Sequence, residues 1–207
     1  MRIKTKSNLH TGKDYIDVLE GGKHEFKVNV HFNAGDYMIF LHDWLVENGW
    51  GNPKDQDFRE EFYHHKFIQG GLEEIRWWWR LKRNPPEGES SFYRYEMNID
   101  VRIIAMKKTE VMKRGMKFKG NHGDVTTAFE GKLILDKEHR WRNHALLKNF
   151  YSLYKNRIIH DEIWAHRTFI LKEIHRVMDA VKGYYKLDIV RPEKEDEGTF
   201  GFNVDYD

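Results

Sequence analysis

The chain has 207 residues, a formal net charge of +2 and no cysteine. This length suits one domain with a sizeable core, and the absence of cysteine excludes disulfides, thiolate chemistry and cysteine-bound zinc or iron–sulfur sites. Charged residues make up 33% of the chain, but aromatic residues reach 14%, so large buried rings can close a core.

Residues 1–22 are polar and end in Gly21-Gly22, which predicts an extended arm. The arm lacks the apolar stretch of a secretory signal. No apolar run approaches the roughly 20 residues that a membrane-spanning helix needs. We therefore expect a soluble, cytoplasmic protein without a membrane partner.

Two elements with different periods follow the arm. Apolar and polar residues alternate over 24–32, which predicts a half-buried strand. Over 33–49 the apolar residues recur at helical spacing, and Gly49 provides a helix stop. The sequence therefore predicts one short N-terminal helix directly after the first strand.

A series of strands is predicted next. Strands are expected over 60–68, 70–83, 91–106 and 126–136, with turns at Arg114-Gly115 and at Asn121–Asp124. Strands in series with short turns favour antiparallel pairing.

The pattern becomes helical over 143–185, where two apolar stripes do not share a phase. One straight helix of that length would measure about 65 Å, so we expect a break near Asn156–Asp161. Residues 188–207 carry seven acidic residues against Arg191 and Lys194, which predicts an acidic flexible tail.

Together these elements predict an α+β fold with a single domain over 23–187. Its architecture is a curved antiparallel sheet of about five to seven strands with the short N-terminal helix and a long C-terminal helix packed on one face. The order of elements resembles that of helix-grip (START-like) domains, but such a likeness would not by itself give a function.

The stretch GGLEEIRWWWRLKR, residues 70–83, contains three consecutive tryptophans. In a strand, Trp77 and Trp79 point to one face and Trp78 to the other. Trp77 and Trp79 would join Tyr93 and Tyr95 in an apolar layer under the C-terminal helix. These four residues predict either a solid aromatic core or the lining of a site for an apolar small molecule.

The opposite face of the same strand alternates cations with a ring: Arg76, Trp78, Arg80 and Lys82. Such a face can bind RNA or single-stranded nucleic acid through stacking and phosphate contacts. Cations of the following segment would extend it: Lys107, Lys108, Lys113, Arg114, Lys117 and Lys119. The alternative is ordinary cross-strand ion pairing, with Arg76 and Arg80 opposite Glu96 and Asp100.

Catalytic and metal signatures are weak in this sequence. His64 and His65 are adjacent and point to opposite faces of a strand, and Glu162 and His166 provide only two ligands. Asn121–Asp124 is more simply a hairpin turn than a catalytic loop. We therefore predict no catalytic residues, no metal and no cofactor, and a non-enzymatic function.

Three stretches, HDWLVENGW, GGLEEIRWWWRLKRNP and EVMKRGMKFKGNHGDV, resemble segments of a family of small, uncharacterised archaeal proteins. The resemblance covers about residues 24–186 and excludes both ends. It implies an archaeal, cytoplasmic setting and carries no known activity or site residues.

Three functions follow as hypotheses. The first is a non-catalytic interaction or assembly protein, as a homo-oligomer or with another protein. The second is nucleic-acid binding by the cationic-aromatic face, and the third is binding of an apolar molecule between sheet and helix.

Overall fold

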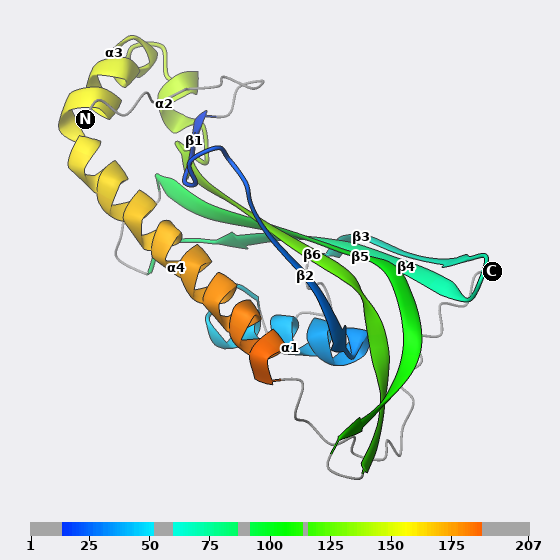
Figure 1. The fold of residues 1–207 in the computed structure, drawn as a ribbon. Helices are drawn as coiled ribbons and strands as arrows, with labels where there is room; N and C mark the ends of the chain where they lie inside the picture. The colour runs from blue at the N-terminus through cyan, green and yellow to red at the C-terminus, as the bar shows by residue number, and fades with distance from the viewer. Residues whose placement is uncertain (1–13, 52–59, 87–91, 114–115, 188–207) are drawn as a thin grey trace.

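The computed structural model describes residues 14–51, 60–86, 92–113 and 116–187 (Figure 1). The predicted acidic tail, 188–207, lies outside the described residues. The elements are β1 (Asp14–Asp17), β2 (His24–Phe32), α1 (Ala34–Glu47), β3 (Glu60–Ile68), β4 (Leu72–Arg83), β5 (Tyr93–Lys113), β6 (Met116–Leu135), α2 (Arg140–Asn143), α3 (Leu147–Leu153), the π-helix η1 (Tyr154–Ile158) and α4 (His160–Leu187). The predicted α+β class is confirmed.

The strands form one antiparallel sheet in the order β1-β6-β5-β4-β3, and β2 also pairs with β6. β6 can serve both because it is long: β1 lies opposite its C-terminal end, with Asp14 opposite Leu135, and β2 lies opposite its middle. Within the described residues the sheet has six strands and is not closed, and this number lies in the expected range of about five to seven. β3 is left at the opposite edge from β1 and β2.

The predicted turn at Asn121–Asp124 is wrong. These residues lie within β6 and pair with both β2 and β5. The glycine there serves a bulge, because Ala105 of β5 has a positive φ of 52° and the β5–β6 register shifts between Ile104 and Lys107. A Cβ on Gly123 would lie 3.0 Å from the Ile104 carbonyl oxygen. Turn-type residues here mark a close backbone approach rather than a chain reversal.

α1 begins and ends at signals that are local in sequence. The Asn33 side chain accepts a hydrogen bond from the Gly35 amide at 3.0 Å, as an N-cap does. After Glu47 the chain turns at Gly49, whose φ is +76°, which is the conformation that favours glycine at a helix C-terminus. The predicted helix stop is confirmed.

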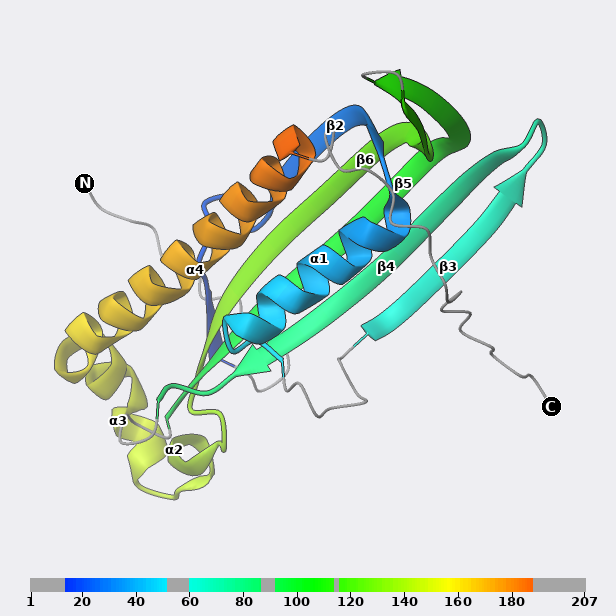
Figure 2. The ribbon, with the colours of Figure 1, turned by 90° about the horizontal axis from the view of Figure 1, so that it is seen from below.

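α1 and α4 lie side by side on the same face of the sheet (Figure 2). α4 crosses β6 at Gly131, where an added Cβ would lie 2.2 Å from Ile174 Cδ1. The absence of a side chain at this strand position lets the helix approach closely. The apolar stripe predicted along the C-terminal helix is therefore buried against the protein's own sheet. Three of its residues, Ile170, Ile174 and Val177, are fully buried.

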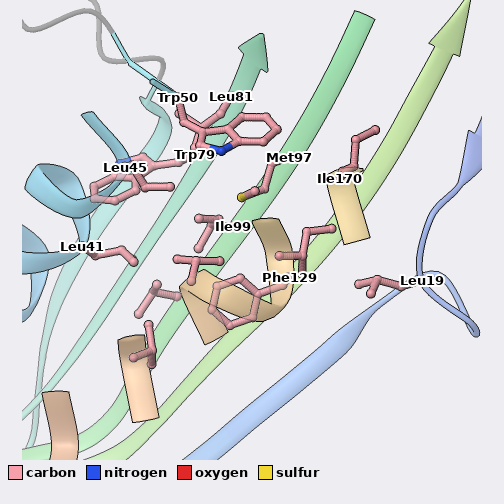
Figure 3. Close-up of a cluster of buried hydrophobic side chains, with 14 of the residues drawn as sticks. Leu19, Leu41, Leu45, Trp50, Trp79, Leu81, Met97, Ile99, Phe129 and Ile170 are labelled. Atoms are coloured by element: carbon pink, nitrogen blue, oxygen red, sulfur yellow. The ribbon is translucent and has the colours of Figure 1, made fainter. Parts of the chain in front are cut away.

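The core lies between these two helices and the sheet (Figure 3). Its deepest polar pair is formed by the Tyr37 hydroxyl of α1 and Thr127 Oγ1 of β6, 2.6 Å apart. Burial raises the pKa of Tyr37 to about 12, because ionisation inside an apolar environment is costly. The pair ties the N-terminal helix to the centre of the sheet.

A second polar cluster links α4 to the residues that follow α1 and to the end of β4. Glu173 of α4 is 5% exposed, and its carboxylate accepts hydrogen bonds from Trp50 Nε1 at 3.3 Å and Arg176 at 2.6 Å. Arg83, at the end of β4, lies 3.7 Å from the same carboxylate and donates to the Asn48 carbonyl at 2.9 Å. A buried carboxylate needs such donors to offset its lost hydration.

The long helical region is interrupted where the sequence predicts a break. α3 passes into the π-helix η1, and α4 starts at His160 after the buried Ile159. α2 and α3 lie beyond the end of the sheet, and α4 returns along it (Figure 1). The break allows one helical segment to cap the end of the fold and the next to cover the sheet.

The predicted N-terminal arm, 1–22, differs from the structure in its second half. Asp14–Asp17 form β1, and Val18 and Leu19 are 1% and 3% exposed. Arg167 of α4 donates a hydrogen bond to the Val18 carbonyl at 3.0 Å. The composition of the whole stretch masked this short apolar group, while residues 1–13 lie outside the described residues.

Candidate functional site

The face of the sheet away from α1 and α4 carries the ring that the tryptophan motif leaves outside the core. Trp78 is 39% exposed and stacks on Phe62 of β3 with a centroid distance of 4.4 Å. The Arg80 guanidinium lies 5.8 Å from the Trp78 ring, within reach of a cation–π interaction. The predicted alternation of cation and ring is therefore present on one surface.

Arg80 on this face is already paired with carboxylates. It donates a hydrogen bond to Asp100 Oδ1 of β5 at 2.6 Å. Asp100 also forms a salt bridge with Lys23, whose Nζ lies 3.1 Å from Asp100 Oδ2. The cross-strand alternative thus holds for Arg80. Its guanidinium is less available to a phosphate, because binding would have to displace a charge-assisted hydrogen bond.

Arg76 is paired as well, but not with the predicted residue. Its Nε donates to Glu74 Oε1 at 2.8 Å, and Arg102 lies 3.4 Å from the same carboxylate. The two arginines lower the pKa of Glu74, with the Arg76 hydrogen bond as the main cause. Arg76 stands opposite Arg102 in the β4–β5 register, so Glu96 is out of its reach.

Glu96 instead pairs with Arg94 at 2.8 Å, and Lys82 stands opposite Glu96 across the strands. Lys82 is exposed. Acidic residues are therefore mixed with the cations over the β4–β5 part of this face. Mixed charge favours a solvated sheet surface over a phosphate-binding track.

The predicted cations of the β5–β6 hairpin do not share one surface. Lys107, Lys108 and Lys119 are exposed, and a pocket of about 420 Å³ contains two of them, Lys108 and Lys119. Lys107 is the neighbour of Lys108 in the strand and points to the other face. The side chains of Lys113, Arg114 and Lys117 lie outside the described residues.

The four apolar candidates are all in the core. Trp77, Trp79, Tyr93 and Tyr95 are each at most 1% exposed. Trp77 packs against Tyr37 of α1 with centroids 6.0 Å apart, and Figure 3 shows Trp79 beside Leu45 and Trp50. α1, and not α4 alone, therefore covers the tryptophans. These contacts favour a filled core, and the apolar-ligand hypothesis stays a prediction.

α4 supplies polar partners to the two core tyrosines. The Tyr93 hydroxyl donates to Glu162 Oε2 at 3.1 Å, and the Tyr95 hydroxyl lies 2.7 Å from His166 Nδ1. Burial, followed by the hydrogen bond to Glu162, raises the pKa of Tyr93. The helical spacing of Glu162 and His166 indicated that they could meet. The tyrosines that they contact follow from the packing of α4 on β5, which the sequence alone does not show.

Within the described residues, no three histidine, aspartate or glutamate side chains gather as they would around a metal ion. Among the described helices, none is both long and apolar enough to cross a bilayer.

The surface that sequence reasoning missed is β3. Its burial pattern has a single partly buried residue, and Tyr63 and Phe67 are 50% and 72% exposed. Only β4 pairs with it among the described residues. The sequence predicts a strand over these residues, but nothing local signals that the strand stands at an edge of the sheet.

Comparison of the chain with models of protein families, with curated proteins and with solved structures finds no match to any of the three.

Proposed function

We propose that this is a non-catalytic assembly protein whose copies associate through the edge of β3 that lies opposite β4. The observation that supports it is the exposure of this nine-residue strand at the end of the sheet. An edge strand presents a row of unpaired backbone N–H and C=O groups to a further strand.

The side chains of β3 make the strand complementary to a second copy of itself. Glu60 and Glu61 stand at its start, and Lys66 stands near its end. Antiparallel pairing of two copies brings the acidic end of each against the basic end of the other. A two-fold axis then makes the contact self-complementary and closed, and the exposed Tyr63 and Phe67 add apolar area.

The buried stripe of α4 directs the proposal to this edge. Ile170, Ile174 and Val177 pack on the chain's own sheet, so a second copy would have to unfold that contact to use them. Edge pairing needs no such rearrangement.

Charge exchange across the edge tests this proposal. Lys66→Glu is expected to shift a dimer toward monomer, because position 66 shares the outer face of β3 with Glu61 and each copy then sets like charges against that residue. Light scattering coupled to size-exclusion chromatography would measure the shift. The double variant Glu61→Lys with Lys66→Glu should restore the dimer, since the charges are complementary again.

Lys172→Glu, an equal change at an exposed position of α4, serves as the matched control and should leave the dimer unchanged. A wild type that stays monomeric at the highest concentration it tolerates would reject assembly through β3.

A second candidate is binding of RNA or single-stranded nucleic acid, which the exposed Trp78–Phe62 stack supports. Affinity should then fall steeply with salt, and Trp78→Ala should weaken binding about ten-fold because base stacking on a ring is lost. Fluorescence anisotropy with a labelled single-stranded oligonucleotide measures both effects. Affinity that ignores salt and Trp78 would remove this candidate.

A further inference from the structure

The segment between β6 and α4 forms a helical cap that is firmly seated on its inner side. The Tyr154 ring stacks on Trp141 with a centroid distance of 4.0 Å, and Phe92 meets Tyr154 edge-on at 6.0 Å. Figures 1 and 2 place α2 and α3 together beyond the end of the sheet. The aromatic contacts fix which side of the cap faces outward.

The outer side of the cap is apolar. Leu146, Phe150 and Leu153 follow the spacing that places residues on one helix face, and they are 69%, 58% and 49% exposed. Ile158 of η1 is 67% exposed. We call these four residues the apolar tip. Because Tyr151 and Tyr154 take the inner side, the tip cannot be buried by a small rotation of α3.

The helical cap itself, from Arg140 to His160, carries charge of a single sign. From Arg140 through His160 the sequence contains no aspartate or glutamate, while Lys148 and Arg157 are exposed. The cations of this stretch are Arg140, Arg142, Lys148, Lys155 and Arg157. Arg140 is paired with the preceding Glu138 at 2.6 Å, so the positive charge is concentrated around α3 and η1.

We propose that the apolar tip docks on the surface of an anionic phospholipid bilayer. Exposed Leu, Phe and Ile side chains with lysine and arginine beside them are the composition that inserts at the headgroup boundary. Four side chains at the end of a molecule are few for a protein interface, which usually takes about 20–30 residues a side. A bilayer accepts so small a tip because it adapts to its shape.

The acidic residues nearest in sequence to the apolar tip are Glu138, Asp161 and Glu162. Glu138 is paired with Arg140, and Glu162 accepts a hydrogen bond from the Tyr93 hydroxyl. The docking differs from crossing a bilayer, which none of the described helices is built to do, and it is independent of the β3 edge.

Co-sedimentation of the full chain with vesicles tests the proposal. We expect binding to phosphatidylcholine vesicles that contain about one third phosphatidylglycerol, little binding to pure phosphatidylcholine, and release at high salt. Lys148→Glu with Arg157→Glu should weaken binding by at least about five-fold for each cation removed. Phe150→Ser with Leu153→Ser should weaken it by at least about ten-fold, because the inserted apolar area is lost.

Matched controls lie on the helices away from the tip. Ile39→Ser changes an apolar side chain that is 59% exposed on α1, and Lys172→Glu changes an exposed cation on α4; both should bind vesicles as the wild type does. The tip side chains are exposed, so their variants should keep the wild-type circular dichroism.

Three results of the vesicle experiments would overturn the proposal. They are the absence of vesicle binding, equal binding to neutral and anionic vesicles, and tip variants that bind vesicles normally. If the tip variants instead change the oligomeric state without vesicles, the tip contacts protein and the lipid proposal is wrong.

Discussion

Replacing Trp77 by alanine is expected to lower the free energy of unfolding by about 3–5 kcal/mol, as truncation of a large buried aromatic side chain does. Trp77 is 1% exposed and packs between Tyr37 of α1 and Trp79 of the same strand. Neither the Tyr37 ring nor the Trp79 ring can move into the cavity left behind, because each is held by its own contacts. Chemical denaturation followed by far-ultraviolet circular dichroism measures the loss.

The neighbouring tryptophan provides the matched control. Trp78 is 39% exposed and loses only its stack on Phe62 and its contact with Arg80, so Trp78→Ala should cost about 1 kcal/mol. If Trp77→Ala does not fold, Trp77→Phe and Trp78→Phe should keep the same order. Equal losses at the two positions would contradict the assignment of faces.

Gly131→Ala is expected to lower the free energy of unfolding by about 1–3 kcal/mol, the usual range for overpacking a core. The new Cβ would lie 2.2 Å from Ile174 Cδ1 and 3.4 Å from both Ile170 Cγ2 and Val18 Cβ. Ile174 is fully buried, so its side chain has no free space to enter. Either its rotamer or the seating of α4 must change.

Two companion variants make this prediction specific. Ile174→Val removes the clashing methyl group, so the double variant with Gly131→Ala should lose less stability than the sum of the single variants. Gly183→Ala, on α4 with open space around the new Cβ, should instead stabilise the protein by up to about 1 kcal/mol. Additive losses at 131 and 174 would show that the two residues do not meet.

Much of the fold follows from periodicity along the chain. Alternation over 72–83 separates Trp77 and Trp79 from Trp78, and the structure places them on opposite faces. The change from strand to helical period identifies α1, and the mismatch of two helical stripes identifies the break before α4. These signals are local, so they can be read without knowing which segments meet.

The sequence-based predictions differ from the structure where the local signals are ambiguous. Asn121–Asp124 has the composition of a turn, but its glycine accommodates the bulge at Ala105. The short apolar group at Val18 and Leu19 was hidden in a polar stretch, although it packs into the core. The cross-strand alternative places Arg76 opposite Glu96, but the β4–β5 register sets Arg76 opposite Arg102, and Arg76 pairs with Glu74.

The fold class, the two faces of β4 and the break before the C-terminal helix can be predicted from the chain, because each depends on the spacing of neighbouring residues. Three features can be seen only in three dimensions: α1 covers Trp77, β3 stands at the edge of the sheet, and the apolar tip faces outward. These features depend on which distant segments pair and pack together. The same exposed side chains would be buried if another strand or helix lay beside them.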